Sequence, residues 1–270
     1  MVVQHNLSAI NTNRQMGVVT DALQKSTEKL SSGYKINRAA DDAAGLSISE
    51  KMRSQIRGLN KASDNAQDGI SLIQVAEGAL NETHSILQRM NELATQAAND
   101  TNTSVDRQSI KDEIEQLNAE LDRISSTTQF NKQDLLTGKF SGKLQVGALE
   151  GQTMDLKIST AVSSTELKVK DIKVSTNENA GKAMKSIQDA IEKVSKQRSK
   201  LGAIQNRLEH TINNLDTNAE NTQAAESRIR DTDMADEMVQ YSKNNILSQA
   251  GQSMLTQANQ QTQGVLSLLQ

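Results

Sequence analysis

The chain of 270 residues contains no cysteine, no proline and no tryptophan, and it has only two tyrosines and two phenylalanines. The absence of cysteine excludes disulfides, thiolate metal ligands and a cysteine nucleophile. Aromatic side chains usually supply much of the buried area of a globular core. Any core of this chain must therefore be built from aliphatic side chains, Met and Ala, which favours several narrow helix contacts over one thick core.

A strong excess of charge is also missing. The 30 basic and 33 acidic residues give a net charge of −3, and no basic run suggests nucleic acid as a partner. No window approaches the roughly 20 apolar residues of a membrane span. The N-terminal segment lacks a charged stretch followed by an apolar one, so we expect no Sec-type signal peptide. We predict neither a nucleic-acid partner nor a membrane partner.

Signatures of catalysis are missing as well. Three histidines lie far apart without metal-ligand spacing, and there is no HExxH: His5, His84 and His210. The adjacent Asp41 and Asp42 have no nearby histidine or carboxylate cluster, so we expect a turn or cap role for them. Residues 147–151, GALEG, lack the Lys-Ser/Thr of a phosphate-binding loop. We therefore expect no enzyme activity, no metal and no cofactor.

The strongest pattern that is present has a period of seven residues. A bulky line of positions recurs without a miss: Met52, Leu59, Ala66, Ile73, Leu80, Leu87 and Ala94. A second line of smaller residues follows three positions later: Ala62, Gly69, Ala76, Thr83, Met90 and Ala97. This heptad predicts a helix from about residue 46 to 98, roughly 80 Å long. A compact domain of this size has a radius of gyration of only about 18 Å, so we expect a rod.

The rest of the chain is predicted to fold back along this helix. Residues 99–104 break it, and Thr103 or Ser104 is expected to cap an antiparallel return over about 110–124. Apolar and polar residues alternate at 143–146, 154–158 and 167–174, which predicts strands or hairpins. Helix resumes near Asn179, breaks at 231–233 and continues to the end. The expected class is mainly α, a long antiparallel helical rod or coiled-coil bundle with a small β-hairpin region near 130–175.

The two ends of the chain are poor in large apolar residues. Isolated helices of this kind are marginal in water, because most helix stability in proteins comes from packing. We expect residues 1–40 and 235–270 to be ordered only when they pack together or against other copies of the chain.

Several long stretches resemble bacterial flagellin. Residues 30–82, beginning LSSGYKINRAADDAAGLSISEKM, resemble its N-terminal conserved region. Residues 199–215, 224–238 and 253–270 resemble its C-terminal conserved region, and residues 144–158 look like the β-hairpin segment of the family. The resemblance covers nearly the whole chain. Because the gap between the conserved halves is short, it implies a short form without large variable outer domains.

The resemblance implies a division into domains. Residues 1–43 with 235–270 would form an inner domain of terminal helices, disordered in the monomer, and residues 44–234 a rod-like outer domain with the hairpin segment 130–175. Four residues would belong to the connector, where glycines permit a change of direction and aspartates cap the new helix: Gly33, Asp41, Asp42 and Gly45. Seven apolar residues would line the filament core and drive polymerisation: Leu7, Ile10, Leu255, Val265, Leu266, Leu268 and Leu269.

The resemblance also implies a function and partners. The chain would be a structural subunit that polymerises with itself into the bacterial flagellar filament for swimming motility. It would be secreted unfolded through the flagellar type III apparatus without a cleaved signal peptide, and it would meet an export chaperone and the filament cap. A hook–filament junction protein, or a coiled-coil scaffold unrelated to flagella, is the alternative interpretation.

One recognition surface follows from the same resemblance. The segment read by the animal Toll-like receptor for flagellin resembles residues 87–94, with Arg89 and Leu93 at its key positions and Glu113 as the acidic partner. We expect Arg89 and Leu93 to be exposed on one helix face, because they are four residues apart. The residues could instead make only subunit contacts within the filament. Three positions depart from better-known members: Met90, Asn91 and Thr95.

Overall fold

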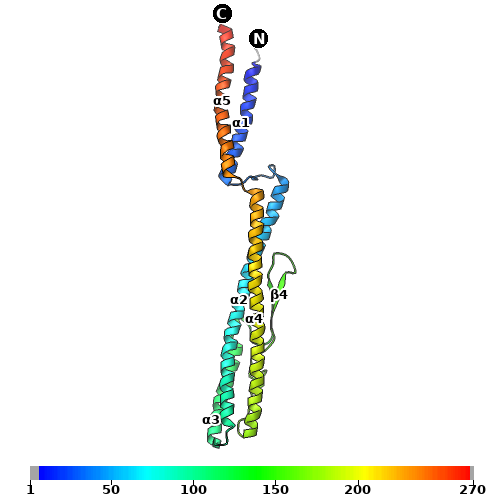
Figure 1. The fold of residues 1–270 in the computed structure, drawn as a ribbon, viewed down its shortest axis with the longest axis vertical. Helices are drawn as coiled ribbons and strands as arrows, with labels where there is room; N and C mark the ends of the chain where they lie inside the picture. The colour runs from blue at the N-terminus through cyan, green and yellow to red at the C-terminus, as the bar shows by residue number, and fades with distance from the viewer. Residues whose placement is uncertain (1–5, 268–270) are drawn as a thin grey trace. The chain divides into compact units, whose positions relative to one another are not determined.

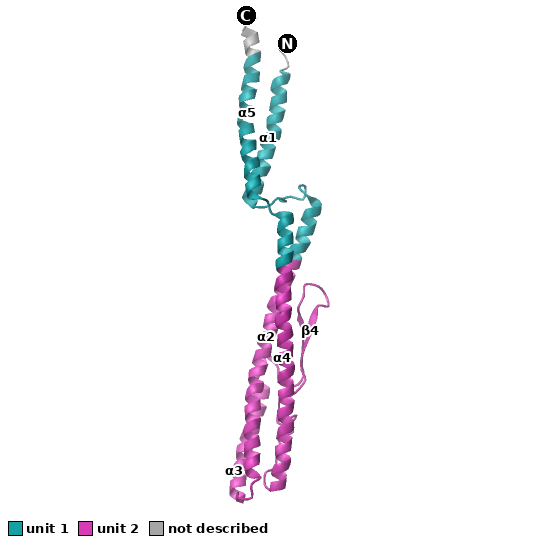
Figure 2. Cartoon of the chain, viewed as in Figure 1, with its two compact units in different colours: residues 1–54, 220–270 teal, residues 55–219 magenta. Residues whose placement is uncertain are grey.

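The computed structural model describes the backbone of residues 6–267 and the side chains of residues 6–261. The chain divides into two compact units, coloured separately in Figure 2. We call Met1–Ser54 with Glu220–Gln270 the terminal unit, and Gln55–Ala219 the central unit.

Helices make up most of the described chain (Figure 1): α1 (Leu7–Ser32), α2 (Ala43–Ala97), α3 (Ser104–Thr127), α4 (Asn177–Arg230) and α5 (Met234–Ser267). Four short strands form two antiparallel pairs: β1 (Gln129–Phe130) with β2 (Gln133–Asp134), and β3 (Phe140–Gln145) with β4 (Thr153–Ile158). The predicted class, a mainly α fold of long antiparallel helices with a small hairpin region, is confirmed.

In the terminal unit, α1 and α5 lie side by side and run in opposite directions (Figure 1). The Asn6 side-chain amide donates to the carbonyl of Ala258 (2.9 Å), and the Lys29 ammonium pairs with the Glu237 carboxylate (3.4 Å). Ser26 is the only buried side chain of α1, and Ala258 is the only one among the described side chains of α5. This helix pair therefore has almost no apolar core within one copy of the chain.

In the central unit, α2 runs antiparallel to α3 and to α4. Contacts between α2 and α4 move in opposite directions along the two helices: Ser63 with Asp216, and Glu77 with Arg198. Arg89 of α2 pairs with Glu113 of α3. The antiparallel return that the short break at 99–104 predicts is therefore present.

The heptad positions of α2 form the core of the central unit. Every position of the bulky and the small line from Leu59 to Ala97 is buried. From Ala66 onward, the apolar heptad residues pack in one cluster with apolar residues of α3, β4 and α4, among them Leu121, Leu156 and Val194. Leu59 and Ala62 pack in a smaller cluster with Leu215 and Ala219 of α4. A fully buried Leu is worth about 1.5–3 kcal/mol relative to an exposed one, so this line of contacts stabilises the central unit without aromatic side chains from α2.

The break between α2 and α3 ends in a capping box. The Thr103 hydroxyl accepts a hydrogen bond from the Asp106 N–H, and the Asp106 carboxylate accepts one from the Thr103 N–H (2.9 Å). Hydrogen bonds from the Thr103 hydroxyl and N–H lower the pKa of Asp106 below its ordinary value. Of the two predicted caps, Thr103 is correct, and Ser104 is the first residue of the helix.

The β-hairpin region is shorter than the alternation predicts. Strand β3 pairs with β4 in the register Phe140 with Ile158 and Gln145 with Thr153. Met154, Leu156 and Ile158 face the core, as their alternation requires.

The strand expected at 167–174 is wrong. This segment consists of turns and irregular backbone, although Leu167, Val169 and Val174 are buried as predicted. The side-chain amide of Asn118, on α3, donates to the Val169 carbonyl (3.0 Å), so a side chain satisfies a group that a strand would pair with a neighbour. The alternation of apolar and polar residues therefore predicts which residues are buried, but it does not predict whether the segment pairs as a strand.

Candidate functional site

The connector between α1 and α2 begins with a left-handed turn. Gly33 has φ 75°, and its N–H donates to the Lys29 carbonyl, which ends α1. A residue with a side chain is disfavoured in this conformation. The Asp41 carboxylate then accepts hydrogen bonds from the N–H groups of Asn37 (3.1 Å) and Arg38 (2.9 Å). These hydrogen bonds, that from Arg38 first, lower the pKa of Asp41.

Asp42 caps α2. Its carboxylate accepts a hydrogen bond from the N–H of Gly45 (2.9 Å), a group that has no partner within the helix. The change of direction expected of Gly45 is wrong, because Gly45 lies in the first turn of α2 and its φ is not positive. A Cβ at this position would lie within 3 Å of both Asp42 and the Ile36 side chain. A glycine at this position lets the Asp42 and Ile36 side chains pack closely against the first turn of α2.

The connector is joined to the segment between α4 and α5, within the terminal unit. Tyr34 and Asp231 form an antiparallel β-bridge, and the Lys35 N–H donates to the Arg230 carbonyl (2.6 Å). The Arg230 guanidinium lies 4.6 Å from the centre of the Tyr34 ring and pairs with Glu50 (3.1 Å). We call these contacts the crossover joint.

The predictions from sequence did not include the pairing of Tyr34 with Arg230. Tyr34 is one of only two tyrosines and lies in a glycine-containing break near the N-terminus. That placement could have identified Tyr34 as one partner of the contact. Nothing in the sequence pattern pointed to Arg230 as its partner.

The predicted polymerisation residues lie on α1 and α5. Leu7 is 72% exposed and Ile10 is 60% exposed, and Leu255 is half-buried. The side chains of the other four lie outside the described residues: Val265, Leu266, Leu268 and Leu269.

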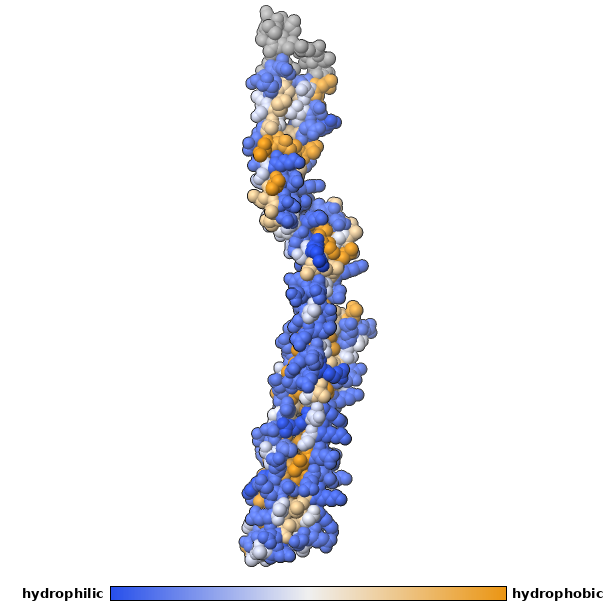
Figure 3. Space-filling model, viewed as in Figure 1, coloured by the Kyte–Doolittle hydropathy of each residue, from blue (hydrophilic) through white to orange (hydrophobic). Residues whose placement is uncertain are grey.

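Exposed apolar side chains are concentrated on this helix pair. Nine of the 14 exposed large apolar residues of the described chain lie on α1 or α5: Leu7, Ile10, Val18, Met234, Met238, Val239, Ile246, Leu247 and Met254. Figure 3 shows apolar patches over both helices. Contiguous exposed apolar surface marks interaction sites on soluble proteins. The pair therefore offers a surface that further protein can cover.

The predicted receptor residues lie on α2 and α3 in the central unit. Arg89 is exposed, and its guanidinium pairs with Glu113 (3.0 Å) and with Glu92 (3.2 Å). The hydrogen bond to Glu113, followed by that to Glu92, raises the pKa of Arg89. The structure thus brings Arg89 and Glu113 together on one surface.

The expected exposure of Leu93 is wrong, since only 2% of it is exposed. Leu93 belongs to the core cluster that also contains Leu87 and Met90. A spacing of four residues turns a helix by about 400°, which is 40° past the starting direction. That rotation moves Leu93 from the exposed side of Arg89 to the edge of the buried stripe.

No helix in the described chain is long and apolar enough to cross a membrane. No group of three His, Cys, Asp or Glu residues within 6–261 could hold a metal ion. The structure therefore offers three features: long paired helices, the crossover joint, and the α1–α5 helix pair with apolar side chains on its surface. Exposed apolar side chains on paired helices are typical of proteins that make contacts with other chains.

Comparisons with known proteins identify the family. The model of the bacterial flagellin N-terminal helical region matches residues 3–141, and that of the C-terminal helical region matches residues 184–269. The chain is 56% identical to a flagellin of Halalkalibacterium halodurans and 51% identical to the flagellin of Bacillus subtilis, with each alignment covering both chains in full. The chain belongs to the bacterial flagellin family.

Solved structures agree with this assignment. The crystal structure of Bacillus cereus flagellin is 32% identical, with a TM-score of 0.51 over 60% of this chain and 94% of that one. A putative flagellar hook-associated protein from Vibrio parahaemolyticus has a TM-score of 0.60 over 71% of this chain and 100% of that one. It is only 13% identical and therefore shows a shared fold alone.

The predicted function is confirmed at this level. The chain is a structural subunit of the bacterial flagellar filament, an extracellular structure that serves motility. A scaffold unrelated to flagella is excluded by the family. Full-length identity of 56% to a flagellin also favours the filament subunit over a junction protein. Membership of a structural protein family fits the expectation that the chain is not an enzyme.

We predict that Asp42→Ala lowers stability by about 1 kcal/mol, because it removes the side chain that caps α2. Asp42→Ser should retain most of that stability, since a hydroxyl also accepts the Gly45 N–H. Chemical denaturation followed by circular dichroism measures both. Equal losses for the two variants would show that the cap is not what Asp42 contributes.

Proposed function

We propose that α1 and α5 form the surface through which each subunit polymerises, as an inner domain of residues 1–43 and 235–270. The observation that carries this proposal is the set of nine exposed apolar residues on a helix pair with almost no buried side chains. Covering them with other copies removes apolar surface from water at about 25 cal/mol per Å². A head-to-tail contact that does not close into a ring makes a filament.

The same observation supports a link between order and assembly. A helix pair with so little core gains most of its stability from contacts with other copies. The predicted disorder of the inner domain in the monomer therefore stays part of this proposal.

Replacing two of these residues by charge should block assembly. We expect Leu7→Glu combined with Ile10→Glu to slow seeded filament growth about tenfold or more, because each added subunit would have to bury two carboxylates against its neighbours. Light scattering and electron microscopy of purified protein measure the growth.

Val105→Glu is the matched control. Val105 is 72% exposed, as Leu7 is, but it lies on α3 in the central unit. This variant should polymerise as the unchanged chain does. Normal filament growth by the Leu7 and Ile10 double variant would refute the proposed surface.

We further propose that the subunit leaves the cell through the flagellar type III apparatus without cleavage of a signal peptide, with an export chaperone and the filament cap as partners. Family membership supports this route. In cells with an inactive export apparatus, the chain should disappear from the culture medium. Mass spectrometry of the secreted chain tests the second part, since removal of an N-terminal peptide would contradict it.

The third proposal is that the animal Toll-like receptor for flagellin recognises the monomer at Arg89 and Glu113. Support comes from the exposed ion pair that these residues form between α2 and α3, and from the matching positions in the family resemblance. Arg is a frequent hot spot of protein interfaces. Leu93 contributes by supporting the helix surface from the core.

Arg89→Ala should lower activation of a cell line that reports this receptor about fivefold or more, while the melting temperature of the monomer stays unchanged. Arg123→Ala is the control, because Arg123 is also an exposed arginine that pairs with a glutamate three residues away, Glu120. Equal effects of the two substitutions would contradict the proposed site.

Leu93→Ala is not a clean probe of receptor contact. It removes a buried side chain and should cost about 2–5 kcal/mol of stability. Loss of signal in this variant would be attributed to recognition only if the folded fraction is unchanged.

A further inference from the structure

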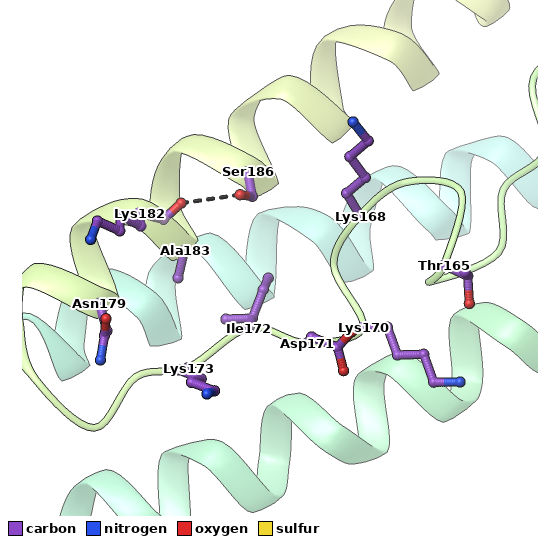
Figure 4. A pocket seen from close by; sticks show the side chains of 10 residues that line it. All are labelled: Thr165, Lys168, Lys170, Asp171, Ile172, Lys173, Asn179, Lys182, Ala183 and Ser186. Carbon is purple, nitrogen blue, oxygen red and sulfur yellow. Dashed lines mark hydrogen bonds between the residues drawn. The ribbon is translucent and has the colours of Figure 1, made fainter.

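A basic groove lies in the central unit, along α4. Two adjoining pockets, each of about 440 Å³, share Lys168 and Ser186 and lie between α4 and the irregular segment 165–173. Figure 4 shows one of them, with Ile172 and Ala183 between the segment and the helix and Lys168 extending toward α4. We call it the lysine groove, after its six lysines: Lys168, Lys170, Lys173, Lys182, Lys193 and Lys196.

The alternation in the segment builds one wall of the groove. Leu167 and Val169 point into the core, which leaves Lys168 and Lys170 exposed. Lys168 has φ 63°, a left-handed conformation that side chains other than Gly, Asn and Asp rarely adopt. Backbone strain of this kind clusters at functional sites, and a glycine would relieve it without presenting a charge.

Contacts with α3 hold this wall in place. The Asp122 carboxylate accepts hydrogen bonds from both the N–H and the hydroxyl of Ser164, each at 2.8 Å. The Ser164 carbonyl in turn accepts from the N–H groups of Val169 (2.9 Å) and Lys170 (3.2 Å). The lysines therefore project from a backbone that is already ordered, which lowers the entropic cost of binding.

The groove is positive in a chain that is negative overall. Six lysines face three lining carboxylates, Asp171, Asp189 and Glu192, and a fourth beside them, Glu178, a local excess of two positive charges against a net charge of −3 for the chain. Lys182 pairs with Glu178. The ammonium groups of the other five make no ion pair within the described chain, so they are available to an anionic ligand.

The remaining lining groups narrow the class of ligand. Thr165, Asn179 and Ser186 offer hydroxyl and amide groups between the lysines. The carboxylates can accept hydrogen bonds from hydroxyl groups, but they would repel a uniformly charged phosphate polymer. No aromatic side chain lines either pocket, whereas proteins that bind single-stranded nucleic acids stack bases on aromatic rings.

We propose that the lysine groove binds an acidic polysaccharide, whose carboxylate or sulfate groups contact the lysines and whose hydroxyl groups contact Thr165, Asn179, Ser186 and the carboxylates. Such a chain combines spaced single charges with hydroxyl groups, as the groove does. The flagellar filament is extracellular, which is where polymers of this kind are met. The proposal is independent of the polymerisation surface, because the groove lies within the central unit.

Binding of a polygalacturonate oligosaccharide to the full chain, measured by calorimetry at low salt, tests the proposal. Saturable binding should weaken about tenfold or more in the combined variant Lys168→Gln, Lys170→Gln, Lys173→Gln, and should fall as salt rises. The matched control is Lys61→Gln, Lys139→Gln, Lys143→Gln, which removes three exposed lysines of the same unit outside the groove. Circular dichroism confirms that both variants are folded.

Lys168→Gly separates the ligand contact from folding. It should raise the melting temperature by relieving the left-handed backbone, and it should still weaken binding. Three results would overturn the proposal: no saturable binding by the unchanged chain, equal weakening in the groove and control variants, or binding of single-stranded DNA or polyphosphate as tight as that of polygalacturonate. Seeded polymerisation of the groove variant should stay normal.

Discussion

The antiparallel burial of the α2 heptad against α3 and α4 is the constraint on which the rest of the structure depends. With almost no aromatic side chains, the central unit relies on a long line of Leu, Ile, Met and Ala, all of them buried from Leu59 to Ala97. Because α3 and α4 of the same chain bury these residues, the core of the central unit needs no second copy of the chain. The helix pair of the terminal unit has no comparable core and keeps its apolar residues on the surface. The proposed use of the terminal unit for assembly rests on this difference.

Most of the fold could be predicted from periodicity. A period of seven identifies α2 because each step of the repeat returns to the same side of the helix, and the breaks at 99–104 and 231–233 carry recognisable capping residues. The segment 167–174 failed for a physical reason. Alternating burial is necessary for a half-buried strand, but it also arises when an irregular segment is fastened to a core by a side chain such as Asn118. A strand differs from such an irregular segment only in having a neighbouring strand to pair with, and the alternation pattern does not show whether one is present.

The candidate site was predicted unevenly for similar reasons. Asp42 and Gly33 were predictable because capping and left-handed turns are local. Gly45 and Leu93 were misread because their roles depend on what packs against them: the Asp42 cap and Ile36 in one case, the core in the other. The contact of Tyr34 with Arg230 joins residues almost 200 positions apart and leaves no periodic signal. The lysine groove lies within residues 165–196, but the packing of its irregular segment beside α4 is a tertiary contact that the sequence pattern did not predict.

The crossover joint has a mechanical consequence. Two covalent segments pass between the paired terminal helices and the ends of α2 and α4, and backbone hydrogen bonds fasten them side by side in opposite directions. A pull on either segment is therefore shared with the other before the chain can extend, and the Arg230 ion pair with Glu50 transfers part of the load to α2. Two connecting segments that are hydrogen-bonded to each other resist a pulling force better than a single flexible linker.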